Sequence, residues 1–197
     1  TAAAVRPAVV LTALLLLPTV CGCAHVRYRA GTRGPRGVRV ADVRQNNRMG
    51  CGAACLVSVL TYWGCPVSED EITAQLGAVP REGYRLGDLA AYARGKGLTA
   101  ILMSGNLSDL RYHCVRGRPC IVVYRRDGDI NHSVVVLDIE DTSAGYGALT
   151  VMDPSSGRTR RRSADWFDAR WRQVGAPLLL IARTNRNAAG VATGGDR

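Results

Sequence analysis

A cysteine and a histidine, two residue types that work together in nucleophilic catalysis, occupy distinctive positions in this chain. Cys51 opens a run without charged residues, 51–63, whose apolar pattern predicts a helix buried on most sides. A thiol in the first turn of a helix lies beside unpaired backbone N–H groups and the positive end of the helix dipole, and both favour the thiolate. Cys51 is therefore the candidate nucleophile, and it needs a base that takes its proton and returns it to the leaving group.

The three histidines differ in the segments that contain them. His25 lies in a segment rich in Gly, Arg and Pro, and His113 lies in a predicted amphipathic helix with arginines nearby. His132 opens the most apolar strand of the chain, directly after a turn predicted at 126–129. A polar ring that leads into a core strand needs a hydrogen-bonding partner. His132 is therefore the candidate base.

Two further side chains can complete such a site. Asp153 ends a predicted strand, and the short connection from the strand of His132 predicts antiparallel pairing that brings the carboxylate to the imidazole. There the acid would hold the imidazole in one tautomer. Gln45, six residues before Cys51, can donate an amide N–H to an oxyanion beside a backbone N–H. Each residue alone has an ordinary structural explanation, so the prediction depends on their order along the chain.

The elements that would position these residues follow from hydrophobic periodicity and capping. Helices are predicted at about 51–63, between Ser68 and Gly77, and at about 86–94, 107–115 and 164–173. Ser68 and Glu71 form a capping box, and Ser163 caps the last helix. Strands are predicted at about 99–103, 120–125, 132–140, 149–153 and 178–183. Helices followed by antiparallel strands predict an α+β domain in which the early helix packs against the sheet.

Four motifs, spread over roughly residues 40–183, together resemble one family of cysteine peptidases. They are Gln45 with Cys51-Gly52-x-Ala54-x-Leu56, Asn131-His132-x-Val134-Val135-Val136, Val151-Met152-Asp153-Pro154-x-x-Gly157, and Trp166-Phe167-x-x-Arg170-Trp171. In these motifs the chain is similar to the C39 peptidases, papain-like enzymes that process bacteriocins. The resemblance implies a papain-like fold with Cys51 as nucleophile and His132 as general base. It also implies that Asp153 is the orienting acid and that Gln45 supplies the oxyanion amide.

The chain departs from the C39 pattern at two positions and in one larger feature. Gly50 stands where the family usually has Asp before the catalytic cysteine, and Asn131 stands where Gly often precedes the histidine. Family members fused to export transporters carry membrane helices and an ATPase, whereas this sequence has no Gly-x-x-x-x-Gly-Lys-Ser/Thr loop. The chain therefore resembles the stand-alone, lipoprotein-type members. No ATP, other cofactor or metal is expected.

Three functions fit these residues. The resemblance implies a cysteine peptidase that cleaves a peptide or protein substrate, with cleavage after a small-residue motif such as Gly-Gly in a leader peptide. The same order of Cys, His and a polar residue also serves papain-like amidases and acyltransferases, which would act on cell-wall peptides. Related modules without a working triad bind peptides and do not cleave them. The chain would be such a module if Gly50 or Asn131 prevented the catalytic residues from adopting their working arrangement.

The beginning of the chain predicts export and attachment to a membrane. Arg6 precedes an apolar stretch at 8–17 that is too short to span a bilayer, so residues 1–23 are predicted to be a signal peptide. Val20-Cys21-Gly22-Cys23 resembles a bacterial lipobox and predicts lipidation at Cys23. A plain secretory signal and an uncleaved anchor are the alternatives, and all three predict export.

Composition divides the rest of the chain. Gly, Arg and Pro predominate before the catalytic motifs, and small polar residues predominate at the end. The predicted segments are a flexible tether at 24–44, a C39-like peptidase domain at 45–183 and a disordered tail at 184–197. With a lipid anchor, this organisation predicts a membrane-bound lipoprotein of the bacterial cell envelope, on the periplasmic side of the outer membrane if the cell is Gram-negative.

Charge and cysteine content narrow the choice of partners. The formal net charge is +10, almost all from arginines spread along the chain. The chain lacks a nucleic-acid-binding motif and interleaved aromatic residues, so no nucleic-acid partner is expected.

Export permits disulfides among Cys55, Cys65, Cys114 and Cys120, with Cys51 left free and the pairing open. Zinc is disfavoured because the sequence has no Cys-x-x-Cys pair.

Overall fold

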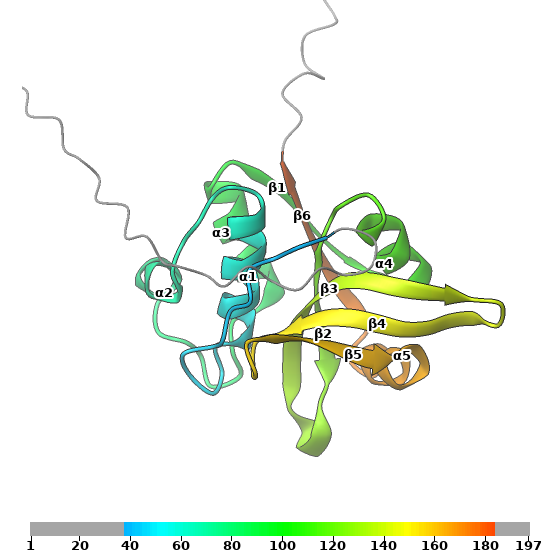
Figure 1. The fold of residues 1–197 in the computed structure, drawn as a ribbon. Helices are drawn as coiled ribbons and strands as arrows, with labels where there is room; N and C mark the ends of the chain where they lie inside the picture. Colours follow the sequence, from blue (N-terminus) through cyan, green and yellow to red (C-terminus); the bar gives the residue numbers. More distant parts are fainter. Residues whose placement is uncertain (1–37, 184–197) are drawn as a thin grey trace, which may run out of the picture.

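A six-stranded antiparallel sheet forms the middle layer of the domain (Figure 1). The structure is a computed structural model that describes residues 38–183. The strands are β1 (Leu98–Ser104), β2 (Cys120–Arg125), β3 (Asn131–Thr142), β4 (Gly145–Asp153), β5 (Arg158–Ser163) and β6 (Pro177–Arg183). Their order across the sheet is β1-β6-β2-β3-β4-β5. Each neighbouring pair is antiparallel, and β3 lies inside the sheet between β2 and β4.

Helices lie on both sides of this sheet, as Figure 1 shows. The helices on one side are α1 (Cys51–Tyr62), α2 (Glu69–Leu76) and α3 (Leu86–Gly95), and those on the other are α4 (Leu107–Cys114) and α5 (Ala164–Arg172). Along β3, Val135 and Leu137 join the core under α1, whereas Val134 and Val136 join the core under α4 and α5. Successive strand residues point to opposite faces, so the run 134–137 of β3 is apolar at every position because both faces are covered there. The structure confirms the α+β class and the packing of the early helix on the sheet.

The first helix, α1, occupies the centre of its side of the sheet. Residues 52–60 are all buried. The Ser58 hydroxyl, which is polar within this apolar run, donates a hydrogen bond to the Ala41 carbonyl at 2.6 Å. Gly64, with a φ of +78°, turns the chain just after the helix in a conformation that favours glycine. The predicted buried helix is therefore confirmed, and its first residue is Cys51.

The segment that leads into the site corrects one predicted boundary. Val38, Val40 and Val43 are buried in the core under α1, so residues 38–44 are part of the packed domain and not of a tether that extends to residue 44. Three valines within six residues, at 38, 40 and 43, make this segment apolar enough to be buried, a signal that the Gly-, Arg- and Pro-rich residues before it conceal. The predicted signal peptide, Cys23, the rest of the tether and the tail lie outside the described residues.

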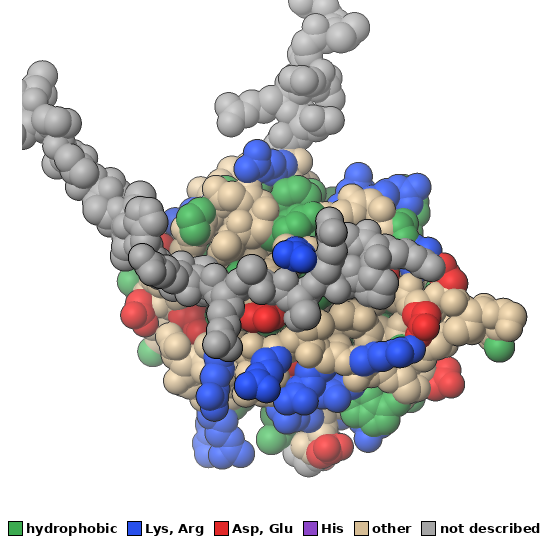
Figure 2. All heavy atoms as spheres, in the orientation of Figure 1, with side chains coloured by type: hydrophobic (Ala, Val, Ile, Leu, Met, Phe, Trp, Pro, Cys, Tyr) green, Lys and Arg blue, Asp and Glu red, His purple; other side chains and the backbone are tan. Residues whose placement is uncertain are grey.

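The strand β5 is absent from the sequence prediction. Its sequence, RTRRRS, contains no apolar residue, and all of its residues are exposed or half-buried. It pairs with β4 from Arg158 opposite Asp153 to Ser163 opposite Ala148. Figure 2 shows Lys and Arg side chains gathered over this region of the surface. The strand therefore forms one edge of the sheet through backbone pairing and presents arginines to solvent.

The other elements agree with their predicted positions to within a few residues. A short 3-10 helix, η1 (Asp127–Asp129), joins β2 to β3 and confirms the predicted hairpin. The hairpin of β3 and β4 is longer than predicted, because β4 begins at Gly145 and β3 continues to Thr142. Across residues 38–183, no helix combines the length and the apolar character needed to span a bilayer.

All five cysteines in the described part of the chain are free thiols. Cys114 and Cys120 are in contact within the core under α4 and α5, and Cys55 is enclosed in the core under α1. The sheet lies between these two cores, so Cys55 cannot reach the other pair. No disulfide joins the five described cysteines in the structure, so Cys51 is free, and so are the four others.

Candidate active site

Three segments that are distant in the sequence bring Cys51, His132 and Asp153 together. Cys51 is the first residue of α1, which packs across β3, and His132 is the second residue of β3. Asp153 ends the neighbouring antiparallel strand β4. The Nε2 atom of His132 lies 2.9 Å from Oδ1 of Asp153, and the Cys51 thiol is hydrogen-bonded to His132. Since Nε2 faces the carboxylate, the ring nitrogen that faces sulfur is Nδ1.

The acid in this group is held in its ionised form. Asp153 is only 2% exposed, and burial alone would raise its pKa. Hydrogen bonds from His132 and from the hydroxyl and backbone N–H of Ser155 outweigh burial and hold the pKa of Asp153 well below its ordinary value. A carboxylate that stays charged keeps the proton of the neutral imidazole on Nε2, which leaves Nδ1 free to act as a base toward sulfur.

The thiol and the imidazole shift each other in opposite directions. Burial would raise the pKa of Cys51, but hydrogen bonds to His132 and Ser133 and the positive charge of His132 lower it below its ordinary value. Burial would also lower the pKa of His132, but its bonds to Asp153 and Cys51 raise it. These shifts favour a thiolate–imidazolium pair, whose two apparent pKa values belong to the pair as a unit.

Three residues that contact Cys51 or Asp153 were not predicted from the sequence. Ser133 is 6% exposed, and its backbone N–H and hydroxyl both bond to the sulfur of Cys51. Ser155 donates its N–H and its hydroxyl to Asp153 Oδ1 at 3.0 and 2.7 Å. The Asp-Pro-Ser sequence carries a signal for this turn, because Asp side chains commonly bond the backbone two residues on. Ser133 carries no comparable signal, because it looks like any residue of an apolar strand.

The third missed residue, Arg162, approaches the acid from β5. Its Nη2 atom lies 3.4 Å from Oδ2 of Asp153, on the carboxylate oxygen that His132 does not use. The guanidinium carbon lies 5.7 Å from the centre of the Trp166 ring, which gives the side chain a second contact. No sequence signal indicated this pairing, because β5 itself was not predicted. Arg162 adds a positive charge beside the acid, at the carboxylate oxygen that does not bond His132.

Gln45 lies beside the group, but its amide is already occupied. Its Nε2 donates to the carbonyl oxygens of Asn47 at 2.7 Å and Arg48 at 2.9 Å, while Oε1 is buried without a partner among the described residues. Exchanging the amide nitrogen and oxygen would turn an oxygen toward two carbonyls, which is unfavourable. Both N–H groups therefore hold the loop that leads into α1. An oxyanion role requires one of them to leave its carbonyl when substrate binds.

Gly50, the first departure from the C39 pattern, is explained by its surroundings. A Cβ at this position would lie 3.0 Å from Glu69 Oε2 and 3.1 Å from Asn47 Nδ2. Glu69 is 7% exposed and accepts the backbone N–H of Asn46 at 3.2 and 3.3 Å. Glycine therefore leaves room for a carboxylate that arrives from α2. The loop before Cys51 therefore contacts a carboxylate, that of Glu69, although residue 50 is a glycine and not the aspartate usual in the family.

Two hollows meet at Cys51. The larger, here called the large cleft, has a volume of about 770 Å³ and is lined by residues that include Gly83, Tyr84 and Ser133. The smaller, here called the small pocket, has a volume of about 250 Å³ and is lined by residues that include Gln45 and His132. A chain that lay through both would pass over the sulfur, as a peptide must if its bond is to be attacked there.

No metal centre accompanies this arrangement in the part of the chain that the structure describes. Within residues 38–183, no three His, Cys, Asp or Glu side chains converge as a metal site would need. His113 is partly buried on α4, with an Nδ1 atom that has no hydrogen-bond partner among these residues. Cys114, next to it in the sequence, bonds the Val136 carbonyl at 3.7 Å and points into the core.

A comparison with known families assigns this fold. The model of the Peptidase C39 family matches residues 39–185, from the buried valines before α1 to the end of β6. The chain belongs to the Peptidase C39 family. Another protein, an uncharacterized one from Methanothermobacter marburgensis, shares 33% identity with this C39 chain over 120 residues, which cover 61% of this chain and 75% of the relative.

Two solved peptidase domains share the C39 fold. The peptidase domain of Streptococcus ComA, a bifunctional ABC transporter involved in a quorum-sensing pathway, matches 72% of this chain and 97% of that domain, with a TM-score of 0.61 and 20% identity. A double-glycine-motif protease from an AMS/PCAT transporter, solved with its leader peptide, matches 80% of this chain and 100% of that one, with a TM-score of 0.60 and 22% identity. These matches confirm the predicted fold.

Proposed function

We propose that this C39 protein is a cysteine peptidase whose catalytic triad is Cys51, His132 and Asp153. One observation carries the proposal. The imidazole of His132 bonds the carboxylate of Asp153 through one nitrogen and the thiol of Cys51 through the other. A nucleophile, a base and an orienting acid in this order are what acyl transfer from a peptide bond requires. The lowered pKa of Cys51 supplies thiolate without a separate activating step.

The reaction follows from this geometry. The Cys51 thiolate attacks the carbonyl carbon of the peptide bond, and the carbonyl oxygen takes the negative charge. His132 gives its proton to the leaving nitrogen as the C–N bond breaks, which releases an amine and leaves a thioester on Cys51. His132 then takes a proton from water, whose oxygen attacks the thioester and restores the thiolate as the acid product leaves. Asp153 holds the ring and stabilises the imidazolium throughout.

The oxyanion is stabilised at the start of α1. The first backbone N–H groups of a helix have no partner inside the helix, so the N–H of Cys51 is available to the developing charge. Gln45 is the proposed second donor. Its amide would turn one N–H from the Asn47 or Arg48 carbonyl toward the oxyanion, which is the stronger acceptor because it is charged.

The proposed substrate is a peptide or a protein segment with small residues before the scissile bond. This step rests on the family and on the double-glycine-motif protease that shares the fold and was solved with its leader peptide. The large cleft is compatible with it, because glycines at 52, 83 and 87 line its wall and allow the backbone of a bound peptide to approach closely.

The proposed setting is the bacterial cell envelope, with the protein anchored to a membrane by lipid on Cys23, on the periplasmic side of the outer membrane if the cell is Gram-negative. The support comes from the lipobox-like sequence that ends at Cys23, which lies outside the described residues. Cells that express the full chain and take up a labelled fatty acid would label this protein. Replacing Cys23 with Ala would remove the label and release the protein from the membrane fraction, and a labelled Cys23→Ala variant would exclude lipidation at that residue.

The peptidase proposal is tested with the full chain and a Cys51→Ala variant. Peptides from the cell envelope, and synthetic peptides that contain Gly-Gly, are incubated with each, and the products are identified by mass spectrometry. Cleavage by the wild type alone, with free acid and free amine products, supports the proposal. Products joined to an added amine would indicate an acyltransferase. Release confined to cell-wall fragments would indicate an amidase, and binding of peptide without any product would indicate a non-catalytic module.

A further inference from the structure

The large cleft and the small pocket differ in their access to the general acid. Both are lined by Cys51, but only the small pocket is lined by His132. In the proposed reaction His132 gives its proton to the leaving nitrogen, so that nitrogen must lie on the side of His132. The small pocket therefore receives the residues after the scissile bond, and the large cleft receives those before it. This assignment rests on the proposed peptidase function.

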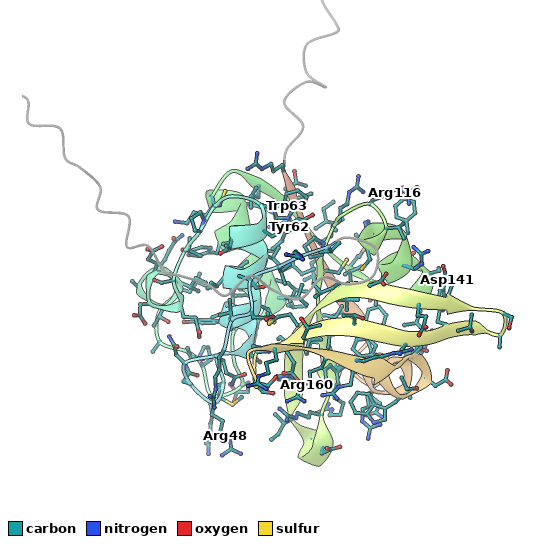
Figure 3. The ribbon with its side chains drawn as sticks, viewed as in Figure 1. Arg48, Tyr62, Trp63, Arg116, Asp141 and Arg160 are labelled. Atoms are coloured by element: carbon teal, nitrogen blue, oxygen red, sulfur yellow. The ribbon has the colours of Figure 1, made fainter. Side chains whose placement is uncertain are left out.

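Two arginines from different loops line the small pocket. Arg48 comes from the loop before α1, and Arg126 comes from the turn between β2 and β3. Both side chains are exposed, and neither makes a hydrogen bond or an ion pair with another described residue. Figure 3 shows Arg48 projecting outward from its loop at the lower edge of the domain. Two guanidinium groups are thus available at a pocket that adjoins the candidate triad.

The one acidic residue of the small pocket does not cancel these charges. Asp127 lines the pocket as well, but its carboxylate lies 3.6 Å from a guanidinium nitrogen of Arg170, on α5. One negative charge that already has a cationic partner therefore faces two positive charges that have none. The surroundings of the pocket are net positive, and a carboxylate that entered it would meet two forked donors suited to its two oxygens.

The large cleft has the opposite balance. Its charged lining residues are Glu82 and Asp88, both exposed, and Arg85 between them. Two acids and one base leave this side net negative. The two hollows that meet at Cys51 therefore differ in the sign of their charge as well as in size, so a substrate with charge on one side of its scissile bond would bind in one direction better than in the other.

We propose that Arg48 and Arg126 make this peptidase select substrates that carry acidic residues in the first positions after the scissile bond. The chemical class is a peptide whose leaving half begins with carboxylate side chains. Each charge pair at such a partly exposed site changes a rate by about threefold, so two pairs together give about tenfold. The preference weakens as salt is added, because exposed charges are screened.

The test uses two fluorescence-quenched peptides that share the half before the scissile bond. One carries aspartate at the first two positions after that bond, and the other carries asparagine there, so the two differ in charge and hardly in shape. The wild type is expected to give a kcat/KM ratio of about 10 in favour of the acidic peptide at low salt. In the double variant Arg48→Gln, Arg126→Gln the ratio falls to about 1.

A matched variant controls for net charge. Arg116→Gln removes one positive charge, as Arg48→Gln or Arg126→Gln does alone, but Arg116 lies after α4, stacked on Tyr112, far from Arg48 in Figure 3. It is expected to keep the wild-type ratio between the two peptides. Equal kcat/KM values for the two peptides in the wild type would overturn the charge selection and leave the peptidase function intact. A preference that survives in the double variant would also overturn the assignment to Arg48 and Arg126.

A binding measurement separates the two proposals. If the wild type cleaves neither peptide, the peptidase function fails, and the anisotropy of the same peptides, labelled, is then measured with the Cys51→Ala variant. Tighter binding of the acidic peptide, lost in Cys51→Ala combined with Arg48→Gln and Arg126→Gln, would support the pocket as an acidic-peptide site without catalysis. Equal binding of both peptides would overturn the charge selection as well.

Discussion

Two cysteines on the same helix, Cys51 and Cys55, lie one turn apart and have opposite properties. Cys51 is half-buried at the first turn of α1, and its pKa is lowered. Cys55 is fully buried in the second turn, and burial raises its pKa well above the ordinary value, with further raising by the nearby charge of Cys51. Both thiols belong to one helix and share its dipole. The difference must come from what lies across from each of them.

The element across from Cys51 is the start of β3. His132 and Ser133 reach the sulfur of Cys51 from there, whereas Cys55 meets only apolar core. A helix N-terminus favours a thiolate, but its effect falls off within the first turn and is modest by itself. The fold therefore lowers the pKa of one thiol by bringing a strand end to it, and raises the pKa of the other by enclosing it. Four changes would break or sharpen this contrast.

The largest effect is expected from His132→Ala, which would make Cys51 resemble Cys55. Without the base and general acid, kcat/KM for a peptide should fall by at least about 10³-fold. The pKa of Cys51 should rise, because burial remains and the bonds that oppose it are lost. In the wild type, thiolate forms above the lowered pKa of Cys51 and imidazolium is lost above the raised pKa of His132, so activity should be bell-shaped between them.

Iodoacetamide labelling from about pH 5 to about pH 9, followed by peptide mapping, measures the thiol directly. Wild-type Cys51 should label at a pH where an ordinary thiol, with a pKa of about 8.5, does not. The His132→Ala variant should lose this early labelling, and Cys55→Ala should keep it. Labelling of Cys51 that is unchanged in His132→Ala would contradict the proposed ion pair.

The second effect concerns the acid. Asp153→Asn should lower kcat by about 10²- to 10⁴-fold with little change in KM, because an amide no longer fixes the tautomer that leaves Nδ1 free for sulfur. Asp138→Asn is a matched control, since Asp138 is also a buried acid of the β3–β4 pair but makes no hydrogen bond with His132 in the described structure. Steady-state kinetics per folded molecule would distinguish them. Equal losses in both variants would point to a general effect on the fold.

A smaller effect is expected for Arg162→Gln. The positive charge of Arg162 lies 3.4 Å from Asp153. It partly offsets the effect of the negative Asp153 carboxylate on the pKa of His132. Its removal should raise the pKa of His132 further and move the alkaline limb of the activity profile to higher pH, while kcat falls about threefold as the carboxylate loosens. Arg161→Gln is the control, because Arg161, the neighbouring arginine on β5, pairs with Glu140 and not with Asp153. An alkaline limb that does not move would exclude this positioning role.

The smallest effect on catalysis, and a clear effect on stability, is expected for Cys55→Ser. A hydroxyl in this apolar core should lower the free energy of unfolding by about 1 to 3 kcal/mol. The kcat of the folded protein should stay unchanged, since Cys55 does not contact His132. Cys65→Ser, at a half-buried position, should change stability by less than about 0.5 kcal/mol. Urea unfolding with parallel activity assays checks both variants.

The sequence predicted the parts of the fold that depend on burial. α1 and β3 have long apolar runs because both are covered on nearly every side, and runs of this kind are visible without a structure. The positions of Cys51, His132 and Asp153 at the ends of such elements were predictable for the same reason. Residues 38–44 were assigned to the tether because the Gly- and Arg-rich residues before them concealed the three valines at 38, 40 and 43.

The contacts around the candidate triad could not be predicted in the same way. Ser133 and Arg162 contact the site only because β3 passes α1 and β5 pairs with β4, and neither residue is unusual in its own segment. The explanation for Gly50 also needed α2, whose Glu69 carboxylate occupies the space beside it. Short-range patterns predict which segments form elements. They do not predict which polar side chains meet when distant segments pack together.

The arginine-rich strand β5 has a consequence for how these molecules behave when crowded together. A strand at the border of a sheet offers free N–H and C=O groups that a neighbouring molecule could pair with. Two copies that approached through β5 would bring rows of guanidinium groups face to face, and their repulsion would oppose stacking into aggregates. The opposite border, β1, displays Ile101 and Leu102 without this protection. Self-association on concentration or partial unfolding should therefore begin at β1, and neutralising β5 would open a second route.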